Sequence, residues 1–254
     1  MNRCFMSSNT ECGGGCLYCF SKWQEYKKFE LQSLSMDDNI IYPNCDGDMF
    51  DTNFEKMLDQ LNGIQQKYSI SVSTKFNIAE SDLQLLKMLH DKMSYMKKGI
   101  VKLSVSFSCS KSIEKIEPGT ADYDERIRLV RRISENGLPY VTIIKPILPF
   151  INSDEYYRIV KDTIQYSPYY LIGDLYVSKT TDFYEKFIKG KYRTELRKVN
   201  WNGNNGPWET VVDEKKKNDI INFIISKGGK VFESDEVVMA HLVNMVKEGV
   251  TKDE

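Results

Sequence analysis

Histidine is almost absent from this 254-residue sequence, which contains only His90 and His241. They lie far apart along the chain, and neither belongs to the closely spaced pairs that zinc sites use. Net charge is also small, at −1 from 35 basic and 36 acidic residues. This balance excludes a protein whose overall charge draws it to nucleic acid or to a membrane surface.

A long apolar run is missing as well. A membrane-spanning helix needs about 18 to 20 successive apolar residues, and the longest candidate, 141–151, is interrupted by Lys145, Pro146 and Pro149. The first six residues lack the apolar core of a secretory signal. We therefore expect a cytoplasmic protein without a membrane partner, in a reducing compartment that keeps thiols free.

Cysteine, in contrast, is concentrated near the N-terminus, where three of the six cysteines form the sequence Cys12-Gly-Gly-Gly-Cys16-Leu-Tyr-Cys19. This C-x3-C-x2-C spacing can bring three thiols to one metal centre, and the glycines let the backbone wrap tightly. An iron–sulfur cluster normally takes four protein ligands. Three leave one metal position open, which is typical of reactive rather than structural sites. The alternative is a zinc-stabilised binding module without enzymatic activity, its site completed by a histidine.

This loop, with an aromatic residue just before the third cysteine, resembles the cluster loop of the radical S-adenosylmethionine (SAM) enzymes. The resemblance implies a [4Fe–4S] cluster bound by Cys12, Cys16 and Cys19, with SAM on the open iron. It also implies reductive cleavage of SAM to a 5′-deoxyadenosyl radical that abstracts a hydrogen atom from the substrate. An electron donor such as flavodoxin or ferredoxin is then required.

The rest of the sequence alternates between strand-like and helix-like segments, which predicts an α/β fold with a parallel sheet. Alternating or apolar runs predict strands at 3–7, 39–43, 68–74, 100–107, 140–146 and 169–177. Helical spacing predicts helices at 53–67 and 124–136, and capping patterns at Ser81 with Gln84 and at Ser153 predict two more. Six such units favour a partial (β/α)6 barrel of the TIM type, with the strand-end loops on one face.

The composition changes near residue 190. We expect residues 1–190 to form the barrel and residues 191–254 to form an extension packed on it, with a hairpin at 199–212 and then a helix. The basic segment 189–198 is followed by Trp201 and Trp208. Basic and aromatic residues together can contact nucleic acid. A solvated basic stretch before a packed hairpin also explains them, and we favour that interpretation.

Four further stretches at predicted strand ends resemble spore photoproduct lyase and its DNA-photolyase-like relatives. They are Asn-Cys-Asp-Gly-Asp at 44–48, Thr-Lys-Phe at 74–76, Ser-Val-Ser at 104–106 and Ile-Glu-Pro-Gly-Thr at 116–120. Their order after the cysteine loop carries the resemblance, which covers about residues 10 to 165. This chain departs from that branch in being shorter and slightly acidic, whereas a duplex-binding enzyme normally has a basic face.

The resemblance implies roles for four residues around the cofactor. Lys75 would hold the SAM carboxylate, a suitable match of charge in a partly buried site. Ser106 would contact the adenosyl moiety, Asp46 the methionyl group, and Tyr18 would pack on the cofactor. Structural alternatives are an ordinary strand-end lysine, a serine that fills one pleat and a tyrosine buried in the core.

Cys45 is the candidate catalytic residue, because a cysteine in the matching stretch of spore photoproduct lyase returns a hydrogen atom to the product radical. A thiol suits this role, since its S–H bond is weak and its pKa is about 8.5. The flanking carboxylates of Asp46 and Asp48 would keep it protonated. The alternative is a cysteine that acts only as a small buried apolar side chain. Glu117 and Arg126 are expected to pair and brace their loop.

Two substrate classes are compatible with these residues. The resemblance to the lyase favours a nucleic-acid lesion. The weak basic character keeps open a second hypothesis, radical modification of a peptide or a small molecule.

Overall fold

A computed structural model describes residues 2–6, 11–19, 39–43, 47–52, 54–64, 67–198 and 207–248. Its centre is a sheet of seven strands, all parallel, in the order β1-β2-β3-β4-β5-β6-β10. The strands are β1 (Asn2–Phe5), β2 (Asn39–Tyr42), β3 (Tyr68–Thr74), β4 (Val101–Phe107), β5 (Tyr140–Ile144), β6 (Tyr169–Ile172) and β10 (Lys230–Phe232). Sequential strands lie side by side from β1 to β6, as in a partial TIM-like barrel.

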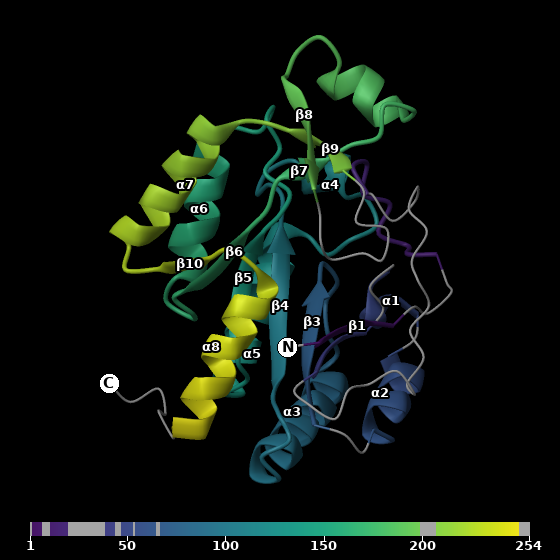
Figure 1. Cartoon of the computed structure of the whole chain (residues 1–254), viewed down its shortest axis with the longest axis vertical. Helices are drawn as coiled ribbons and strands as arrows, with labels where there is room; N and C mark the ends of the chain where they lie inside the picture. The colour runs from purple at the N-terminus through teal and green to yellow at the C-terminus, as the bar shows by residue number, and fades with distance from the viewer. Residues whose placement is uncertain are drawn as a thin grey trace.

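Helices cover both faces of this sheet (Figure 1). They are α1 (Met49–Thr52), α2 (Phe54–Asn62), α3 (Glu80–Tyr95), α4 (Ile113–Ile116), α5 (Tyr123–Glu135), α6 (Ser153–Thr163), α7 (Glu214–Ser226) and α8 (Asp235–Glu248). In the described part of the chain, no helix is both long and apolar enough to cross a membrane.

The two faces of the sheet have different cores because side chains alternate along each strand. On the outer face, residues such as Val105 and Tyr140 pack with α2, α3, α5, α6 and α7. On the inner face, Val141 and Leu171 pack with Val238 and Met239 of α8. Helix α8 therefore closes part of the inner face, as Figure 1 shows where it crosses in front of the strands.

A small antiparallel sheet of β7 (Leu175–Tyr176), β9 (Pro207–Val211) and β8 (Thr194–Lys198) lies at the end of the molecule towards which β4 points (Figure 1). A π-helical turn, η3 (Tyr184–Ile188), lies between β7 and β8 in the chain. The two strands of the predicted hairpin pair as expected, although the first, β8, ends before the predicted start at residue 199. The predicted turn falls outside the described residues. Trp201 also lies outside them.

Several local predictions were wrong. The segment 169–177 forms two strands in different sheets, because the chain leaves the main sheet after Ile172. The backbone of Gly173 is still hydrogen-bonded to the backbones of Ile144 and Ile147. Helix α3 begins at Glu80 with Ala79 as its N-cap, and the amide of Gln84 instead donates to Glu80 and Asn136.

Two further details differ from the prediction. The N-cap of α6 is Asn152, whose side chain accepts a hydrogen bond from the backbone N–H of Asp154, so Ser153 is the first helical residue. Strand β10 was not predicted, and it makes the C-terminal segment part of the main sheet through its pairing with β6.

Candidate active site

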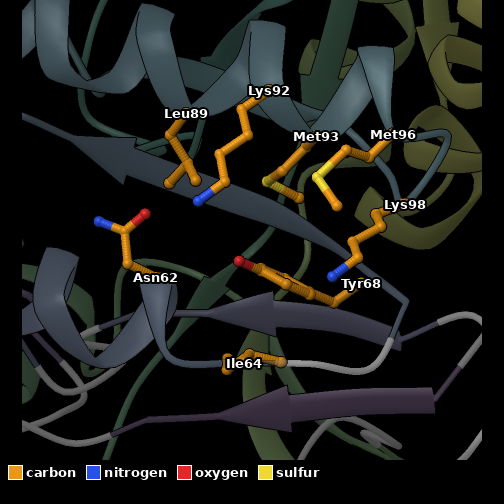
Figure 2. Close-up of a pocket in the computed structure, with 8 residues that line it drawn as sticks. All are labelled: Asn62, Ile64, Tyr68, Leu89, Lys92, Met93, Met96 and Lys98. Carbon is orange, nitrogen blue, oxygen red and sulfur yellow. The ribbon is translucent and has the colours of Figure 1, made fainter.

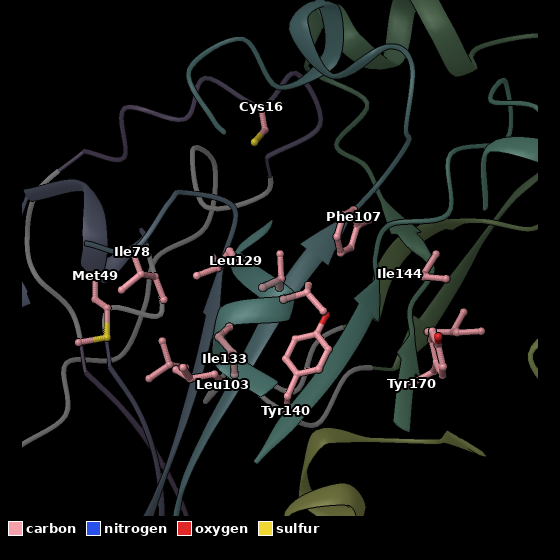
Figure 3. Packing of buried hydrophobic residues seen from close by; sticks show 14 of the residues in the cluster. Cys16, Met49, Ile78, Leu103, Phe107, Leu129, Ile133, Tyr140, Ile144 and Tyr170 are labelled. Atoms are coloured by element: carbon pink, nitrogen blue, oxygen red, sulfur yellow. The ribbon is translucent and has the colours of Figure 1, made fainter. Parts of the chain in front are cut away.

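The cysteine loop lies beyond the carboxyl ends of the strands, next to α4, and Figure 3 shows Cys16 apart from the core side chains in the sheet. Backbone hydrogen bonds fix it there: Leu17 N–H donates to Ile116 (2.9 Å), and Gly119 N–H donates to Gly14 (3.1 Å). The backbone N–H of Gly13 donates to the Asp51 carboxylate (2.5 Å). The loop is thus held between the start of α1 and the segment that follows α4.

The approach of the two loops is so close that only glycine fits at position 119. A Cβ on Gly119 would lie 2.1 Å from the carbonyl oxygen of Gly13. A Cβ on Gly14 would meet Thr120 at 3.2 Å and the sulfur of Cys12 at 3.4 Å. These glycines allow the Glu-Pro-Gly-Thr segment to shape the cysteine loop directly.

The thiols of Cys12, Cys16 and Cys19 are neighbours in this loop. Cys16 is buried and the other two are half-buried. Burial raises the pKa of Cys16 to about 11, the ammonium of Lys75 opposes that rise, and the other two thiols add smaller electrostatic effects. Burial also raises the pKa of Cys12.

Within the described residues, no three side chains of His, Cys, Asp or Glu converge closely enough to hold a metal ion. The three cysteines are therefore grouped in one loop without forming a finished coordination site. The donor set nevertheless fits a [4Fe–4S] cluster in its chemistry, because thiolates are the ligands of such clusters and three of them come from one compact loop.

Glu117 is the centre of a buried network that reaches the cysteine loop. Its carboxylate accepts hydrogen bonds from the hydroxyls of Tyr18 and Ser108 (2.8 Å for Ser108) and pairs with Arg126 at 2.6 Å. Both Glu117 and Arg126 are fully buried. Burial alone would raise the pKa of Glu117, but the positive charges of Lys75 and Arg126 lower it overall. The predicted Glu117–Arg126 pair is confirmed.

Arg126 extends this bracing to the sheet. Its guanidinium donates to the carbonyl oxygens of Ala121 (3.0 Å) and Ser106 (2.8 Å) and to the hydroxyl of Thr120. One buried arginine thus joins β4 to the loop that shapes the cysteines.

Lys75, at the carboxyl end of β3, points into the same region. Its Nζ lies 4.0 Å from the Glu117 carboxylate and 5.6 Å from the centre of the Tyr18 ring. Burial would lower the pKa of Lys75, but Cys16 and Glu117 raise it overall. Lys75 is therefore held as a cation beside the thiols.

Asp48 fixes the end of β3. Its buried carboxylate accepts hydrogen bonds from the Thr74 hydroxyl (2.8 Å) and from the backbone N–H groups of Lys75 (2.9 Å) and Phe50 (3.2 Å). Burial raises the pKa of Asp48. The sequence predicts Asp48 only as a neighbour of Cys45, whereas in the structure its carboxylate orients the backbone of Lys75.

The structure thus places Tyr18 and Lys75 at the loop that carries the three cysteines. Ser106 is nearly buried on β4, and its carbonyl accepts the Arg126 bond. Cys45 and Asp46 lie outside the described residues.

Two serines, Ser104 in β4 and Ser108 just after it, were given no role from the sequence. Ser108 bonds to Glu117, and its position just beyond a buried strand is the signal that would have marked it. The hydroxyl of Ser104 is buried without a hydrogen-bond partner among the described residues. Since buried hydroxyls are normally bonded, this atom suits a polar ligand group on the inner face.

The basic segment before β9 is largely neutralised by acids. Arg197 contacts Asp174, Glu195 and Glu214 at 2.6 to 3.1 Å. Lys189 pairs with Glu185 at 2.9 Å. These pairs support the interpretation of the segment as a structural, solvated stretch.

A separate cavity of about 150 Å³ lies at the opposite end of the sheet, between α3 and β3 (Figure 2). It is lined by Asn62, Ile64, Tyr68, Leu89, Lys92, Met93, Met96 and Lys98. Tyr68 begins β3 and Lys98 precedes β4, so this cavity is far from the carboxyl-end loops that hold the cysteines.

Comparisons with known proteins place this geometry in context. No model of a known protein family matches the sequence. An uncharacterized protein of Methanocaldococcus jannaschii is 24% identical over 190 residues, which cover 68% of this chain and 70% of that protein.

Solved structures share the fold. Spore photoproduct lyase with bound SAM and dinucleoside spore photoproduct matches with a TM-score of 0.63 and 13% identity, over 89% of this chain and 75% of the lyase. Streptococcus suis SuiB bound to SAM matches with a TM-score of 0.56 and 12% identity, over 91% of this chain, which spans about half the length of SuiB (49%). The chain therefore has the partial barrel fold of two SAM-binding proteins, with its three cysteines on the carboxyl-end loops of that barrel.

Proposed function

We propose that this protein is a radical SAM enzyme. The observation that carries the proposal is the group of three neighbouring thiols beyond the carboxyl ends of the strands, beside the cation of Lys75. The shared fold with SAM-bound proteins supports it. In this proposal Cys12, Cys16 and Cys19 hold a [4Fe–4S] cluster. When bound, the cluster would supply the electron that cleaves SAM to methionine and a 5′-deoxyadenosyl radical, which takes a hydrogen atom from the substrate.

The residues of the chain would position SAM and keep water out. Lys75 would offer its ammonium to the SAM carboxylate, because it lies at the cysteine loop and the carboxylate of Glu117, 4.0 Å away, favours its charged form. Ser106 would face the adenosyl moiety, and so would the hydroxyl of Ser104, which has no hydrogen-bond partner among the described residues. Tyr18 and Glu117 would hold the loop rather than react. Asp46 would contact the methionyl group.

Cys45 is proposed as the hydrogen donor to the product radical. The thiol would transfer its hydrogen atom and become a thiyl radical, which a further hydrogen donor must then reduce. The substrate would be a nucleic-acid lesion. Spore photoproduct lyase with bound dinucleoside spore photoproduct supports this choice over a peptide. A flavodoxin or ferredoxin would deliver the electron.

Anaerobic reconstitution with iron and sulfide tests the proposal. We expect about four irons per chain, an absorption band at about 400 nm, and formation of 5′-deoxyadenosine from SAM under dithionite. Cys16→Ala should abolish that product, whereas Cys109→Ala, at another buried cysteine, should retain it. A colourless protein that binds zinc and no iron would reject the enzyme proposal in favour of a zinc-stabilised module. Cys45→Ala should still cleave SAM but change the product.

A further inference from the structure

Lys145 directly follows β5, at the end of the barrel where the strands have their carboxyl ends, which we call the barrel mouth. Its backbone N–H donates to Phe107 of the neighbouring strand (3.1 Å). Its side chain passes directly over Gly173, where a Cβ would lie 2.4 Å from the lysine Cδ. The Nζ atom then lies 5.6 Å from the centre of the Tyr176 ring in β7. The absence of a side chain at position 173 thus permits this path for the lysine.

Among the described residues, the ammonium group of Lys145 has no carboxylate that pairs with it alone. Within the described part of the chain, no ion pair within 4.0 Å joins it to a carboxylate. Of the two acids that act on it electrostatically, Asp174 is bound by Arg197 (3.1 Å) and Lys217 (2.8 Å). The other, Asp235, is bound by Lys102 and by the hydroxyl of Ser71 (2.7 Å).

A half-buried cation without a paired acid is unfavourable, because the charge loses hydration without a compensating partner. Burial lowers the pKa of Lys145, and the nearby cations Lys75 and Lys217 act in the same direction, opposed by Asp235 and Asp174. Lys217 is paired with Asp174 and Lys75 lies 4.0 Å from Glu117, whereas no described carboxylate lies within 4.0 Å of the Lys145 ammonium group. An incoming anion would pair with this ammonium group.

We infer that Lys145 binds an oxyanion of the substrate, namely a phosphodiester group of the nucleic acid. This inference rests on the proposed function and defines a substrate subsite separate from the SAM subsite. Lys75 faces Tyr18 and Glu117 on the side of the cysteine loop, whereas Lys145 crosses to Tyr176 of the small sheet. One lysine would therefore hold the cofactor carboxylate, and the other the substrate.

The aromatic wall beside the amine favours a phosphodiester over a carboxylate. Tyr176 packs edge-on against Trp208, with ring centres 5.3 Å apart, and Tyr176 is the more exposed of the two. A cation beside an aromatic face is the combination that binds a phosphate and stacks an adjoining base. A carboxylate on a peptide would make no use of the ring.

Equilibrium binding to the reconstituted protein tests this subsite. The probes are the dinucleotide thymidylyl-thymidine and its neutral methylphosphonate analogue, which has the same shape without the charge. We expect the wild type to bind the charged probe at least tenfold more tightly, since a hydrogen bond to a charged group contributes about that much. Lys145→Met, which keeps the packing over Gly173, should remove the preference, and Lys145→Arg should keep most of it. Lys98→Met, at the opposite end of the sheet, is the matched control and should bind as the wild type does.

Several outcomes would overturn the inference. One is an unchanged preference in a folded Lys145→Met protein. Another is a Lys145-dependent affinity for acetyl-glutamate amide without one for the dinucleotide, which would indicate a peptide substrate. A third is a Lys145→Met protein in which only the binding of SAM is weakened. Formation of 5′-deoxyadenosine without substrate separates the two proposals. A wild type that makes none but prefers the charged probe through Lys145 would reject the radical SAM function and keep the anion subsite.

Discussion

Tyr18, which lies between the second and third cysteines of the loop, donates a hydrogen bond from its hydroxyl to the carboxylate of Glu117, 99 positions along the chain. Since Glu117 also pairs with Arg126, a single carboxylate connects the cysteine loop to α5 and, through Arg126, to β4. The shape of the loop therefore depends on a buried charge network as well as on its own glycines.

Tyr18→Phe should loosen the loop without removing a cluster ligand. The lost hydrogen bond to a charged group is expected to cost about 1.5 to 3 kcal/mol of unfolding free energy. We expect iron content after reconstitution to fall part of the way, whereas Cys16→Ala should lose most of the cluster. Urea unfolding and iron analysis measure the two effects. If Tyr18→Phe has wild-type stability and full iron content, Tyr18 has no positioning role.

Removal of Glu117 should destabilise the whole protein strongly. Glu117→Ala leaves the buried guanidinium of Arg126 without its carboxylate, and breaking a buried pair in this way typically costs about 3 to 5 kcal/mol. Urea unfolding at neutral pH measures the loss. The matched control is Arg131→Ala, which removes an exposed pair with Glu135 on the same helix and should leave the urea midpoint unchanged. Equal midpoints for both variants would contradict the role given to the network.

Lowering the pH should remove the contribution of Glu117 to the stability of the folded protein. The pKa of Glu117 in the folded protein is lower than its ordinary value, which is about 4.3 in an unfolded chain. The stabilisation is therefore complete above that value and is lost as the pH falls towards the folded pKa. We expect the stability difference between the wild type and Glu117→Gln to be constant near neutral pH and to narrow below about pH 4.3. A difference that widens in acid would contradict this assignment.

The strongest predictions from sequence were those whose cause is local. Strand β3 was predicted with its observed bounds, Tyr68–Thr74, because its alternation is regular. The capping pattern at Ser81 predicted the wrong start for α3, because the pattern does not show which residue before the helix is extended. The same pattern operates at Asp122 with Glu125 at the start of α5, but at α3 the extended residue before the helix is Ala79, so Ser81 lies inside it.

Features that depend on distant residues could not be predicted. Strand β10 has three residues and is stabilised by pairing with β6, about 60 positions earlier. Lys102 and Asp235 are 133 positions apart, and neither stands out in its own segment. In the site, the Glu117–Arg126 pair was predicted because the two residues lie close together in one recognisable stretch, whereas the anchoring role of Asp48 depends on the folded position of Thr74. Cys45 stays a prediction.

Gly119→Ala should disturb the cysteine loop selectively. The added methyl group would lie 2.1 Å from the carbonyl oxygen of Gly13, so the two loops must separate. We expect a folded protein that retains well under half of the wild-type iron and forms correspondingly less 5′-deoxyadenosine. Gly63→Ala is the matched control, because a Cβ there meets nothing closer than 3.5 Å. If Gly119→Ala has full iron content, close contact between these loops does not shape the site.

The buried pair of Lys102 and Asp235 should determine whether α8 stays on the inner face. Asp235, at the first turn of α8, pairs with fully buried Lys102 of β4 and accepts a hydrogen bond from Ser71 of β3. Asp235→Ala leaves the lysine buried and unpaired, which we expect to cost about 3 to 5 kcal/mol. Replacing both partners, Lys102→Met with Asp235→Ala, should recover much of that loss, because no unpaired charge remains.

Urea unfolding of the two variants, together with hydrogen exchange of the α8 amides, measures the effect. Asp235→Ala should increase exchange along α8 more than along α3, whose packing on the outer face does not involve the pair. If the single and double variants are equally destabilised, the loss arises from the missing bonds of Asp235 rather than from the stranded charge of Lys102. The pair would then act as a local hydrogen-bonding contact, and α8 would be held mainly by Val238, Met239 and Leu242 against the sheet.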